Sequence, residues 1–361
     1  MKKILYISHV SWGWIKQRPQ FIAEELSKAY EVDCYYAKSN RFNSVNGDFK
    51  KDNLKVKGFC FWPFERISFL PLSWLDGINK HLFNTYHIDF DKYDIIWMTD
   101  PRYYFLLKEK IKGKILVYDC MDDMLEFPYM KRYPKLALYE ANEEEKLLRD
   151  ANIVLCSAKV LQEKLEKRYG FHREMEIINN AIADEITMYS EQGEMLPQNS
   201  LVYIGTISEW FDFKSVISSL NKHPELNVLL YGPIRMQNPP KHERLIYKGS
   251  VEHKDILGIM NGAMGLIMPF VVNELIVSVN PVKLYEYIYS GKPICASRYG
   301  ETEKFVDYVT LYSSEEDFDD FVGKLLSGCI AVDRRKMREY ALQNTWRNRA
   351  EQVKIVIEKQ R

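Results

Sequence analysis

The sequence lacks the features that mark several common functional classes. Its 50 basic and 50 acidic residues cancel, so no overall positive field favours a nucleic acid as partner. No segment reaches the roughly 18 consecutive apolar residues that a membrane-spanning helix needs. The apolar stretch near the N-terminus is too short for a signal peptide. These absences predict a cytoplasmic protein that does not bind nucleic acid.

Cysteine pairs and glycine-rich nucleotide motifs are also missing. The six cysteines lie far apart, without a Cys-x-x-Cys pair, and several fall within apolar strand-like runs. We interpret them as reduced core residues. Neither half of the chain contains Gly-x-Gly-x-x-Gly, which disfavours an oxidoreductase that uses a dinucleotide.

The composition provides enough apolar and aromatic material for two cores. Of the 361 residues, 46% are hydrophobic and 14% aromatic, which indicates a folded globular protein. A chain of this length exceeds the size at which a single core remains efficient, so two domains are expected. The 24 tyrosines also suit a surface that binds carbohydrate.

Strand-like and helical patterns alternate along the first half of the chain. Short apolar runs predict strands at 4–8, 31–37, 94–99, 114–119 and 153–157, and helical spacing predicts helices at 19–28, 103–111, 134–149 and 158–169. This alternation predicts a doubly wound parallel α/β sheet, which is a Rossmann-like domain over residues 1–185.

A second α/β domain is predicted after a linker. Residues 186–199 are polar, carry Gly and Pro and show no clear period, as is typical of a linker. Strands are then predicted at 201–205, 228–232, 244–248 and 265–268, with helices at 212–221 and 253–262. The second Rossmann-like domain therefore covers residues 200–335, and residues 336–361 follow as one long helical pattern.

The segment from residue 280 to residue 293 is the most informative part of the chain. Asn280 can cap a helix, Pro281 suits the first helical position, and Gly291 followed by Pro293 provides a C-terminal stop. The backbone N–H groups left free at the start of such a helix form an anion site.

Two opposite charges project from one face of this predicted helix. Lys283 and Glu286 are three residues apart, while Leu284 and Ile288 point into a core. This geometry suits a nucleotide diphosphate, with one charge for phosphate and the other for ribose hydroxyls. A well-capped surface helix with an ordinary ion pair has the same spacing, so the spacing alone leaves both interpretations open.

Several motifs, in a fixed order over nearly the whole chain, resemble those of GT-B glycosyltransferases. The closest likeness is to bacterial family 4 type (group 1) enzymes that build surface polysaccharides. The motifs are the Trp and Arg-Pro-Gln loop at 12–20, Tyr-Asp-Cys-Met-Asp-Asp at 118–123, Tyr-Ile-Gly-Thr-Ile-Ser at 203–208, Tyr-Gly-Pro at 231–233, Asn-Pro-Val-Lys-Leu-Tyr-Glu-Tyr at 280–287 and Trp-x-x-Arg at 346–349. The resemblance implies two Rossmann-like domains that face a cleft, with a C-terminal helix that crosses back to the first domain.

The resemblance also implies that the second domain binds a nucleotide-sugar donor. The expected contacts come from loops at the carboxyl ends of its strands and from the capped helix. They are Gly205, Thr206, Ser208, Gly232, Arg235, Glu274, Ser278, Val279, Asn280, Lys283, Leu284 and Glu286. Many family 4 enzymes carry Glu-x7-Glu here, but the first position is Ser278 in this chain, so the donor prediction depends mainly on Lys283 and Glu286. Because Lys283 and the helix N-terminus would neutralise the departing diphosphate, no metal or other cofactor is expected.

Acceptor contacts are expected in the loop after the first strand of the first domain. The resemblance points to Trp12, Gly13, Trp14 and Arg18. Aromatic planes pack against sugar rings, and Gly13 would permit close approach. A hydrophobic loop that packs on the domain is the alternative.

Three carboxylates follow the strand at 114–119. A glycosyl transfer needs a hydrogen-bond acceptor beside the attacking hydroxyl, and Asp122 is the first choice, followed by Asp119 and His9. An Asp-x-Asp metal site is the competing interpretation, but such sites belong to a different glycosyltransferase fold. For Asp123 we expect the capping of the following helix.

Two further segments have more than one interpretation. The aromatic-rich stretch at 58–71 suits either contact with a membrane surface or a buried irregular connection. The basic C-terminal helix suits a solvated face or contact with anionic lipid. Association with the inner face of the cell membrane is therefore left open.

These features together predict a hexosyltransferase. It would move a sugar from a nucleoside diphosphate sugar to a saccharide or lipid-linked saccharide in bacterial surface polysaccharide synthesis. The alternatives are a GT-B-like nucleotide-sugar epimerase and a non-catalytic two-domain protein that binds a sugar or a nucleotide.

Overall fold

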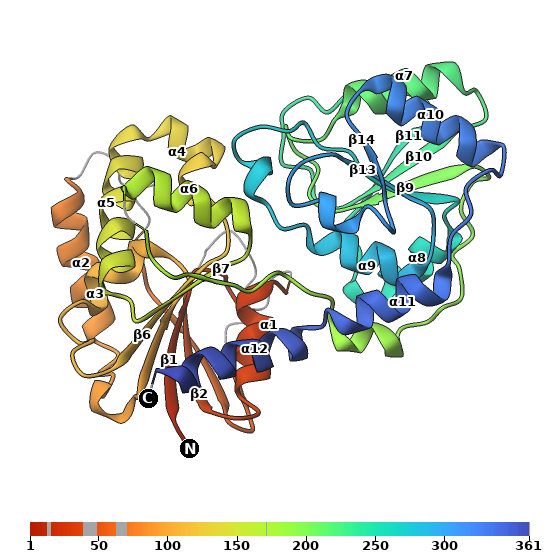
Figure 1. Ribbon diagram of the computed structural model, residues 1–361. Coiled ribbons are helices and arrows are strands. Elements are labelled where there is room, and N and C mark those ends of the chain that lie inside the picture. The colour runs from red at the N-terminus through yellow and green to blue at the C-terminus, as the bar shows by residue number, and fades with distance from the viewer. Residues whose placement is uncertain (13–15, 39–48, 63–70, 171, 361) are drawn as a thin grey trace. The chain divides into compact units, whose positions relative to one another are not determined.

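A computed structural model of the chain describes residues 1–12, 16–38, 49–62, 71–170 and 172–360. The chain forms two compact units, which Figure 1 draws with their elements labelled. Unit 1 comprises Met1–Asn179 and Arg349–Arg361, and unit 2 comprises Asn180–Asn348. The chain therefore passes between the units twice, and the end of the C-terminal helix belongs to unit 1.

Unit 1 contains an eight-stranded sheet with the order β3-β4-β2-β1-β5-β6-β7-β8. Its strands are β1 (Lys3–Ser8), β2 (Glu31–Ala37), β3 (Phe49–Lys51), β4 (Leu54–Phe59), β5 (Ile95–Met98), β6 (Ile115–Cys120), β7 (Ile153–Cys156) and β8 (Glu176–Ile177). Only the β3–β4 pair is antiparallel among the described strands. The central strands are buried on both faces, which explains why they are continuous apolar runs rather than alternating ones.

The helices of unit 1 follow its parallel strands along the chain. They are α1 (Arg18–Leu26), α2 (Leu72–Asn84), α3 (Tyr104–Leu107), α4 (Pro128–Arg132), α5 (Pro134–Asp150) and α6 (Lys159–Tyr169). Side chains of α2, α3, α5 and α6 pack with the sheet in one hydrophobic cluster. Each parallel strand pair needs such a crossover connection, so the alternation in the sequence predicts this topology.

Unit 2 contains a six-stranded parallel sheet with the order β11-β10-β9-β12-β13-β14. The strands are β9 (Ser200–Ile204), β10 (Asn227–Tyr231), β11 (Leu245–Gly249), β12 (Gly265–Met268), β13 (Ile294–Ser297) and β14 (Thr310–Tyr312). This is the strand order of the Rossmann fold, in which the direction of winding reverses between the first and fourth strands, here β9 and β12. Ligands of such sheets bind outside the carboxyl ends of the strands at that reversal.

Helices cover both faces of the second sheet. Figure 1 shows α7 (Phe213–Lys222) and α10 (Glu315–Leu326) on one face, and α8 (Ile256–Gly262), α9 (Val282–Ser290) and α11 (Arg334–Gln343) on the other. Two separate hydrophobic clusters, one under each group of helices, match this division. The predicted fold class, two doubly wound α/β domains, is confirmed.

The prediction that residues 336–361 form one long helix is wrong. Two helices, α11 and α12 (Trp346–Lys359), are separated at Asn344 and Thr345. The backbone of Ile182 explains the break, because its N–H donates to Asn344 O at 3.0 Å and its carbonyl accepts from Trp346 N at 3.1 Å. The chain at Ile182, near the start of unit 2, is thus hydrogen-bonded to the chain between α11 and α12, near the end of unit 2.

Several elements were not predicted, namely β3, β4, β8, β14, α2, α4 and α10, and α3 (Tyr104–Leu107) is shorter than the helix expected at 103–111. The residues of the predicted linker at 186–199 belong to unit 2 and pack against α8, where Glu194 N donates to Gly258 O at 2.9 Å. Two of the six cysteines, Cys60 and Cys329, are exposed rather than in the core, and all six are free thiols.

The aromatic-rich stretch at 58–71 is only partly described. Phe59 ends β4 and is buried, and Trp62 is about half exposed, whereas residues 63–70 lie outside the described part of the chain. No helix within the described ranges is long and apolar enough to cross a membrane.

Candidate functional site

Two glycines bring the ends of neighbouring strands together beside the reversal point of unit 2. Gly205 follows β9, and Gly232 follows β10 with φ +144°. A Cβ atom at Gly232 would lie 1.9 Å from the carbonyl oxygen of Gly205, so only glycine fits there. Both glycines are therefore required by the close packing of these two strand ends; Gly232 is buried, and Gly205 is half-buried.

Helix α9 begins at the same edge of the sheet, because it follows β12. The hydroxyl of Tyr287 accepts a hydrogen bond from Ile204 N, at the end of β9, at 2.8 Å. Gly291 ends the helix in the left-handed conformation with φ 69°, as predicted. The start differs from the prediction, since Pro281 occupies the N-cap position and no side chain of the described residues caps the helix.

Asn280 does not cap α9 because its side chain has other partners. Its Oδ1 accepts from the backbone N of Asn180 at 2.8 Å, and its Nδ2 donates to Glu301 at 3.1 Å. The side chain of Asn180 in turn donates to Asn280 O at 2.8 Å. Asn280 therefore ties the start of unit 2 to the start of α9, and the N–H groups in the first turn of α9 have no side-chain cap.

The predicted charged pair of α9 is formed, but it is not an ordinary surface pair. Lys283 Nζ lies 2.8 Å from Glu286 Oε2, and the side chain of Glu286 is only 5% exposed. The other carboxylate oxygen, Oε1, lies 2.8 Å from His253 Nε2. Burial alone would raise the pKa of Glu286, but the charge of Lys283 and the hydrogen bond from His253 outweigh it and lower the pKa to about 2.

Sequence reasoning missed His253 and Tyr189. His253 follows β11, at the carboxyl edge where α9 also starts, and Tyr189 OH lies 2.8 Å from its Nδ1. A histidine just after a strand of a Rossmann-like sheet is a usable signal, but the helical pattern at 253–262 concealed it. The cluster of Tyr189, His253, Glu286 and Lys283 lies wholly within unit 2.

Three residues predicted to contact the donor have their side chains in the interior of unit 2 instead. Ser208 is buried and donates to Glu209 at 2.6 Å, and Ser278 is buried and donates to the carbonyl of Leu275 at 3.1 Å. Leu284 is completely buried in the core. Packing and internal hydrogen bonds thus occupy these three side chains.

The other predicted donor residues lie at or near the surface. Thr206 is half-buried in the loop after β9, where its carbonyl accepts from Tyr203 OH at 2.9 Å. Val279 is half-buried, while Arg235 and Glu274 are exposed in the loops that follow β10 and β12. All four stand at the carboxyl edge of the sheet, as the position of their loops predicts.

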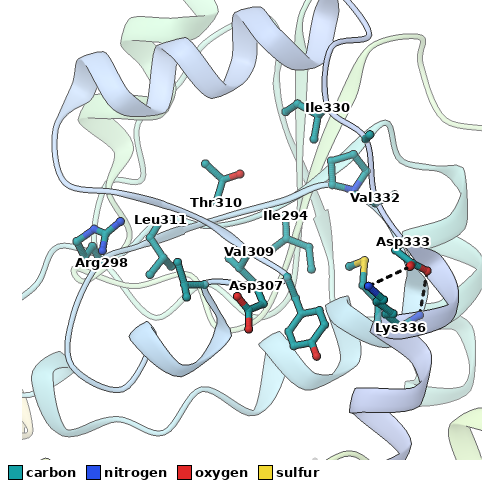
Figure 2. A pocket seen from close by; sticks show the side chains of 15 residues that line it. Ile294, Arg298, Asp307, Val309, Thr310, Leu311, Ile330, Val332, Asp333 and Lys336 are labelled. Carbon is teal, nitrogen blue, oxygen red and sulfur yellow. Dashed lines mark hydrogen bonds and ion pairs between the residues drawn. The ribbon is translucent and has the colours of Figure 1, made fainter.

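A cavity of about 480 Å³ in unit 2 lies away from all the residues predicted to bind the donor. Figure 2 shows its lining, which includes Ile294 of β13, Thr310 of the edge strand β14, and Asp333 and Lys336 at the start of α11. Lys336 N donates to Asp333 at 3.1 Å. The volume alone therefore does not identify the donor region, which is better marked by the strand reversal and α9.

In unit 1, Arg18 and Asp119 form a buried ion pair. Arg18 Nη2 lies 2.7 Å from Asp119 Oδ1, and the side chains are 1% and 0% exposed. Arg18 Nη1 also donates to the carbonyl of Ile178 at 2.5 Å. This burial favours a structural role for both residues, rather than acceptor binding by Arg18 or proton transfer by Asp119.

Asp122 differs from Asp119 in both exposure and hydrogen-bond partners. It is half-buried just after β6, and its carboxylate makes no hydrogen bond within the described part of the chain. Burial raises the pKa of Asp122 to about 7, with a smaller contribution from Asp123, against the opposing charge of Arg18. A carboxylate with this pKa can accept a proton near neutral pH, which is the property of a general base.

His9 follows β1 and is half-buried at the reversal point of the first sheet, between β1 and β5. Its Nδ1 lies 2.8 Å from the hydroxyl of Thr99, which follows β5. Burial lowers the pKa of His9, although the charge of Asp100 opposes the shift. His9 is therefore neutral at pH 7 and can serve as a hydrogen-bond partner.

Asp123 does not cap the following helix. Its buried carboxylate lies 2.8 Å from Arg168 and 3.1 Å from Lys164, both on α6. The two cations of α6 outcompete the backbone N–H groups for this carboxylate. Trp12 is half-buried, and Gly13 and Trp14 lie outside the described residues.

No group of three potential metal ligands converges in the described ranges.

Comparisons with known proteins found similarity in sequence and in fold. No family model matches the sequence. The chain is 23% identical over 248 residues to TuaH of Bacillus subtilis (strain 168), whose name assigns it provisionally as a teichuronic acid biosynthesis glycosyltransferase. The match covers 63% of this chain and 61% of that relative, so the chain spans less than two thirds of the relative's length.

The structural likenesses extend over nearly the whole chain. Sucrose-phosphate synthase from Thermosynechococcus elongatus superposes with a TM-score of 0.74 at 12% identity and covers 99% of both chains. HepE of Anabaena in complex with UDP and glucose superposes with a TM-score of 0.73 at 14% identity, over 99% of this chain and 100% of HepE. The chain therefore has the GT-B fold of these glycosyltransferases.

Proposed function

We propose that the protein is a glycosyltransferase that moves a sugar from a nucleoside diphosphate sugar to a saccharide or lipid-linked saccharide acceptor in bacterial surface polysaccharide synthesis. The observation that carries the proposal is the donor region of unit 2. There, an uncapped helix N-terminus, Lys283 and a permanently charged Glu286 stand beside the reversal of a Rossmann-ordered sheet.

Each part of this region has a chemical role in the proposal. The first-turn N–H groups of α9 and the cation of Lys283 bind the diphosphate and stabilise the charge that develops as it leaves. Glu286 stays ionised at working pH and accepts hydrogen bonds from ribose hydroxyls. Gly205, half-buried at the end of β9, lies at the edge of the sheet where the phosphates approach.

Unit 1 supplies the acceptor side in this proposal. Asp122 removes the proton from the acceptor hydroxyl as that oxygen attacks the anomeric carbon of the donor sugar, and the bond between that carbon and the diphosphate breaks. His9 is a second candidate beside the same strand ends. No metal ion is required by this scheme, because cationic and dipolar groups of the protein neutralise the leaving group.

The donor assignment can be tested by the binding of UDP and UDP-glucose, the ligands that the HepE titles name. Binding raises the melting temperature by mass action, so both ligands should raise it, and calorimetry should give their dissociation constants. Lys283→Ala should weaken UDP binding about tenfold or more, because a charge-assisted hydrogen bond to phosphate is lost. Lys324→Ala is the matched control, since Lys324 pairs with Asp320 on α10.

Turnover separates an enzyme from a binding protein. The wild type should release nucleoside diphosphate slowly from its donor without an acceptor, and faster with one. A protein that binds UDP-glucose without releasing UDP under either condition would not be a transferase. Conversion of the free donor into its epimer, visible by proton NMR, would replace the transferase proposal by an epimerase.

A further inference from the structure

His253 contacts the buried Glu286 from the side opposite to Lys283. It opens the short helix His253–Asp255, and its Nε2 lies 2.8 Å from Glu286 Oε1. Behind it, Tyr189 OH lies 2.8 Å from Nδ1, and the Tyr189 and His253 rings meet edge to face with centroids 5.5 Å apart. The carboxylate on α9 is therefore contacted by His253 from a second segment of unit 2, and His253 is held by Tyr189 from a third.

The chemistry of the partners determines which nitrogen of His253 carries the proton. Glu286 is ionised and can only accept hydrogen bonds, so His253 Nε2 is the donor. Tyr189 contacts the other ring nitrogen, Nδ1, and so holds the ring in the orientation in which Nε2 donates to Glu286.

The two partners of Glu286 fix the orientation of its carboxylate. His253 occupies one oxygen and Lys283 occupies the other. Each carboxylate oxygen has about two lone-pair directions, so each keeps one for a further donor. The side chain of Glu286 is 5% exposed, and those of Lys283 and His253 are 32% and 37% exposed, so the carboxylate lies just beneath the surface that these two partners form.

We propose that His253 is a positioning residue for the nucleotide donor, which orients Glu286 so that its remaining lone pairs accept the ribose hydroxyls. This inference rests on the proposed function. Without His253, Oε1 loses its partner, and the carboxylate can turn so that both oxygens face Lys283. The lone pairs that serve the ribose then point elsewhere.

The test compares ligands with and without the ribose hydroxyls. The dissociation constants of UDP and 2′,3′-dideoxy-UDP are measured by calorimetry for each variant, with GDP and its dideoxy form used where UDP does not bind. The wild type should prefer the ribonucleotide about tenfold or more, because hydrogen bonds to a charged carboxylate are lost with the hydroxyls. His253→Phe keeps a ring beside Tyr189 but removes the donor, and should reduce this preference to about threefold or less.

Three further variants make the result specific. His253→Gln places an amide N–H near the position of Nε2 and should restore most of the preference. Tyr189→Phe should reduce it partially, because the hydrogen bond that holds the ring of His253 is lost. His223→Phe is the matched control, since His223 pairs with Asp319 at 3.2 Å elsewhere in unit 2 and should leave the preference unchanged.

The outcomes distinguish this inference from the proposed function. A wild type that binds neither ribonucleotide overturns both. A wild type that binds the ribonucleotide and its dideoxy form equally overturns only the inference. Equal weakening of both ligands by His253→Phe, with the full preference retained, assigns His253 a merely structural role and also overturns the inference. Thermal unfolding of each variant establishes that it is folded.

Discussion

Replacing Asp122 by Asn should remove activity and at the same time stabilise the protein at alkaline pH. Burial raises the pKa of Asp122 to about 7, whereas an aspartate in an unfolded chain has a pKa of about 3.9. The fold therefore favours the neutral carboxyl, and ionisation of Asp122 opposes folding. Asparagine has nearly the same shape and carries no charge.

The magnitude follows from the shift. At about 1.36 kcal/mol per pKa unit, a shift of about three units corresponds to about 4 kcal/mol. Because Asp122 is only half-buried and water screens part of its charge, we expect about 2 kcal/mol. The folded state binds more protons than the unfolded state between about pH 4 and pH 7, so stability is lost as the pH rises through this window.

Urea unfolding of the wild type and Asp122→Asn at pH 4 and pH 8.5 measures this effect. The variant should match the wild type at pH 4 and exceed it by about 2 kcal/mol at pH 8.5. In the transfer assay, kcat should fall about 10²–10⁴-fold with little change in the KM for the donor, because only a base is lost. The wild-type rate should rise through about pH 7.

Two results would refute this reasoning. An unchanged kcat would remove Asp122 from the reaction, and a variant no more stable than the wild type at pH 8.5 would show that burial does not raise its pKa. Asp91→Asn, at an exposed aspartate of unit 1, controls for the loss of one negative charge.

Three further predictions concern stability. Glu286→Gln should lower the free energy of unfolding at pH 7 by about 3 kcal/mol, because the fold lowers the pKa of Glu286 to about 2. This difference between variant and wild type should vanish as the pH falls from about 4.5 to about 2. A constant difference in urea titrations across this window would contradict the prediction. Asp119→Ala should cost about 3–5 kcal/mol because it leaves Arg18 buried without its partner. The double variant with Arg18→Met should cost less in the same urea titration, and equal losses would indicate that the pair is not coupled. Gly232→Ala should lower stability by more than about 3 kcal/mol, because of the 1.9 Å clash and the positive φ. Gly323→Ala, at a helical position with nothing within 4 Å, should be neutral or stabilise by about 0.5–1 kcal/mol in thermal unfolding. Similar melting temperatures for the two variants would be inconsistent with the clash.

Long apolar runs made most of the fold predictable. The strands β1, β5, β6, β9, β10 and β12 are buried on both faces, so burial and sequence pattern agree. The edge strand β11 was predicted, but the edge strands β3 and β14 were missed, because β3 is entirely exposed and β14 has only three residues. Such strands carry little hydrophobic signal, and pairing with a neighbour defines them.

The candidate site was predictable where a helix places residues at fixed spacing. Lys283 and Glu286 do share a face of α9 and form a pair. Asparagine is a residue type that commonly caps helices, but the backbone amide and the side chain of Asn180, 100 residues away, bind Asn280 instead. Competition between distant partners of this kind leaves no trace in local sequence.

By itself, the sequence determined two doubly wound α/β domains and the helix α9, since hydrophobic periodicity and helix-ending residues are local properties of the chain. Only the tertiary structure decided which polar residues stay accessible. It buried Arg18 against Asp119, left Asp122 half-buried with a raised pKa, and placed His253 on Glu286. Burial and long-range hydrogen bonds depend on which segments meet in space, so carboxylates that look alike in sequence acquire different charges and roles.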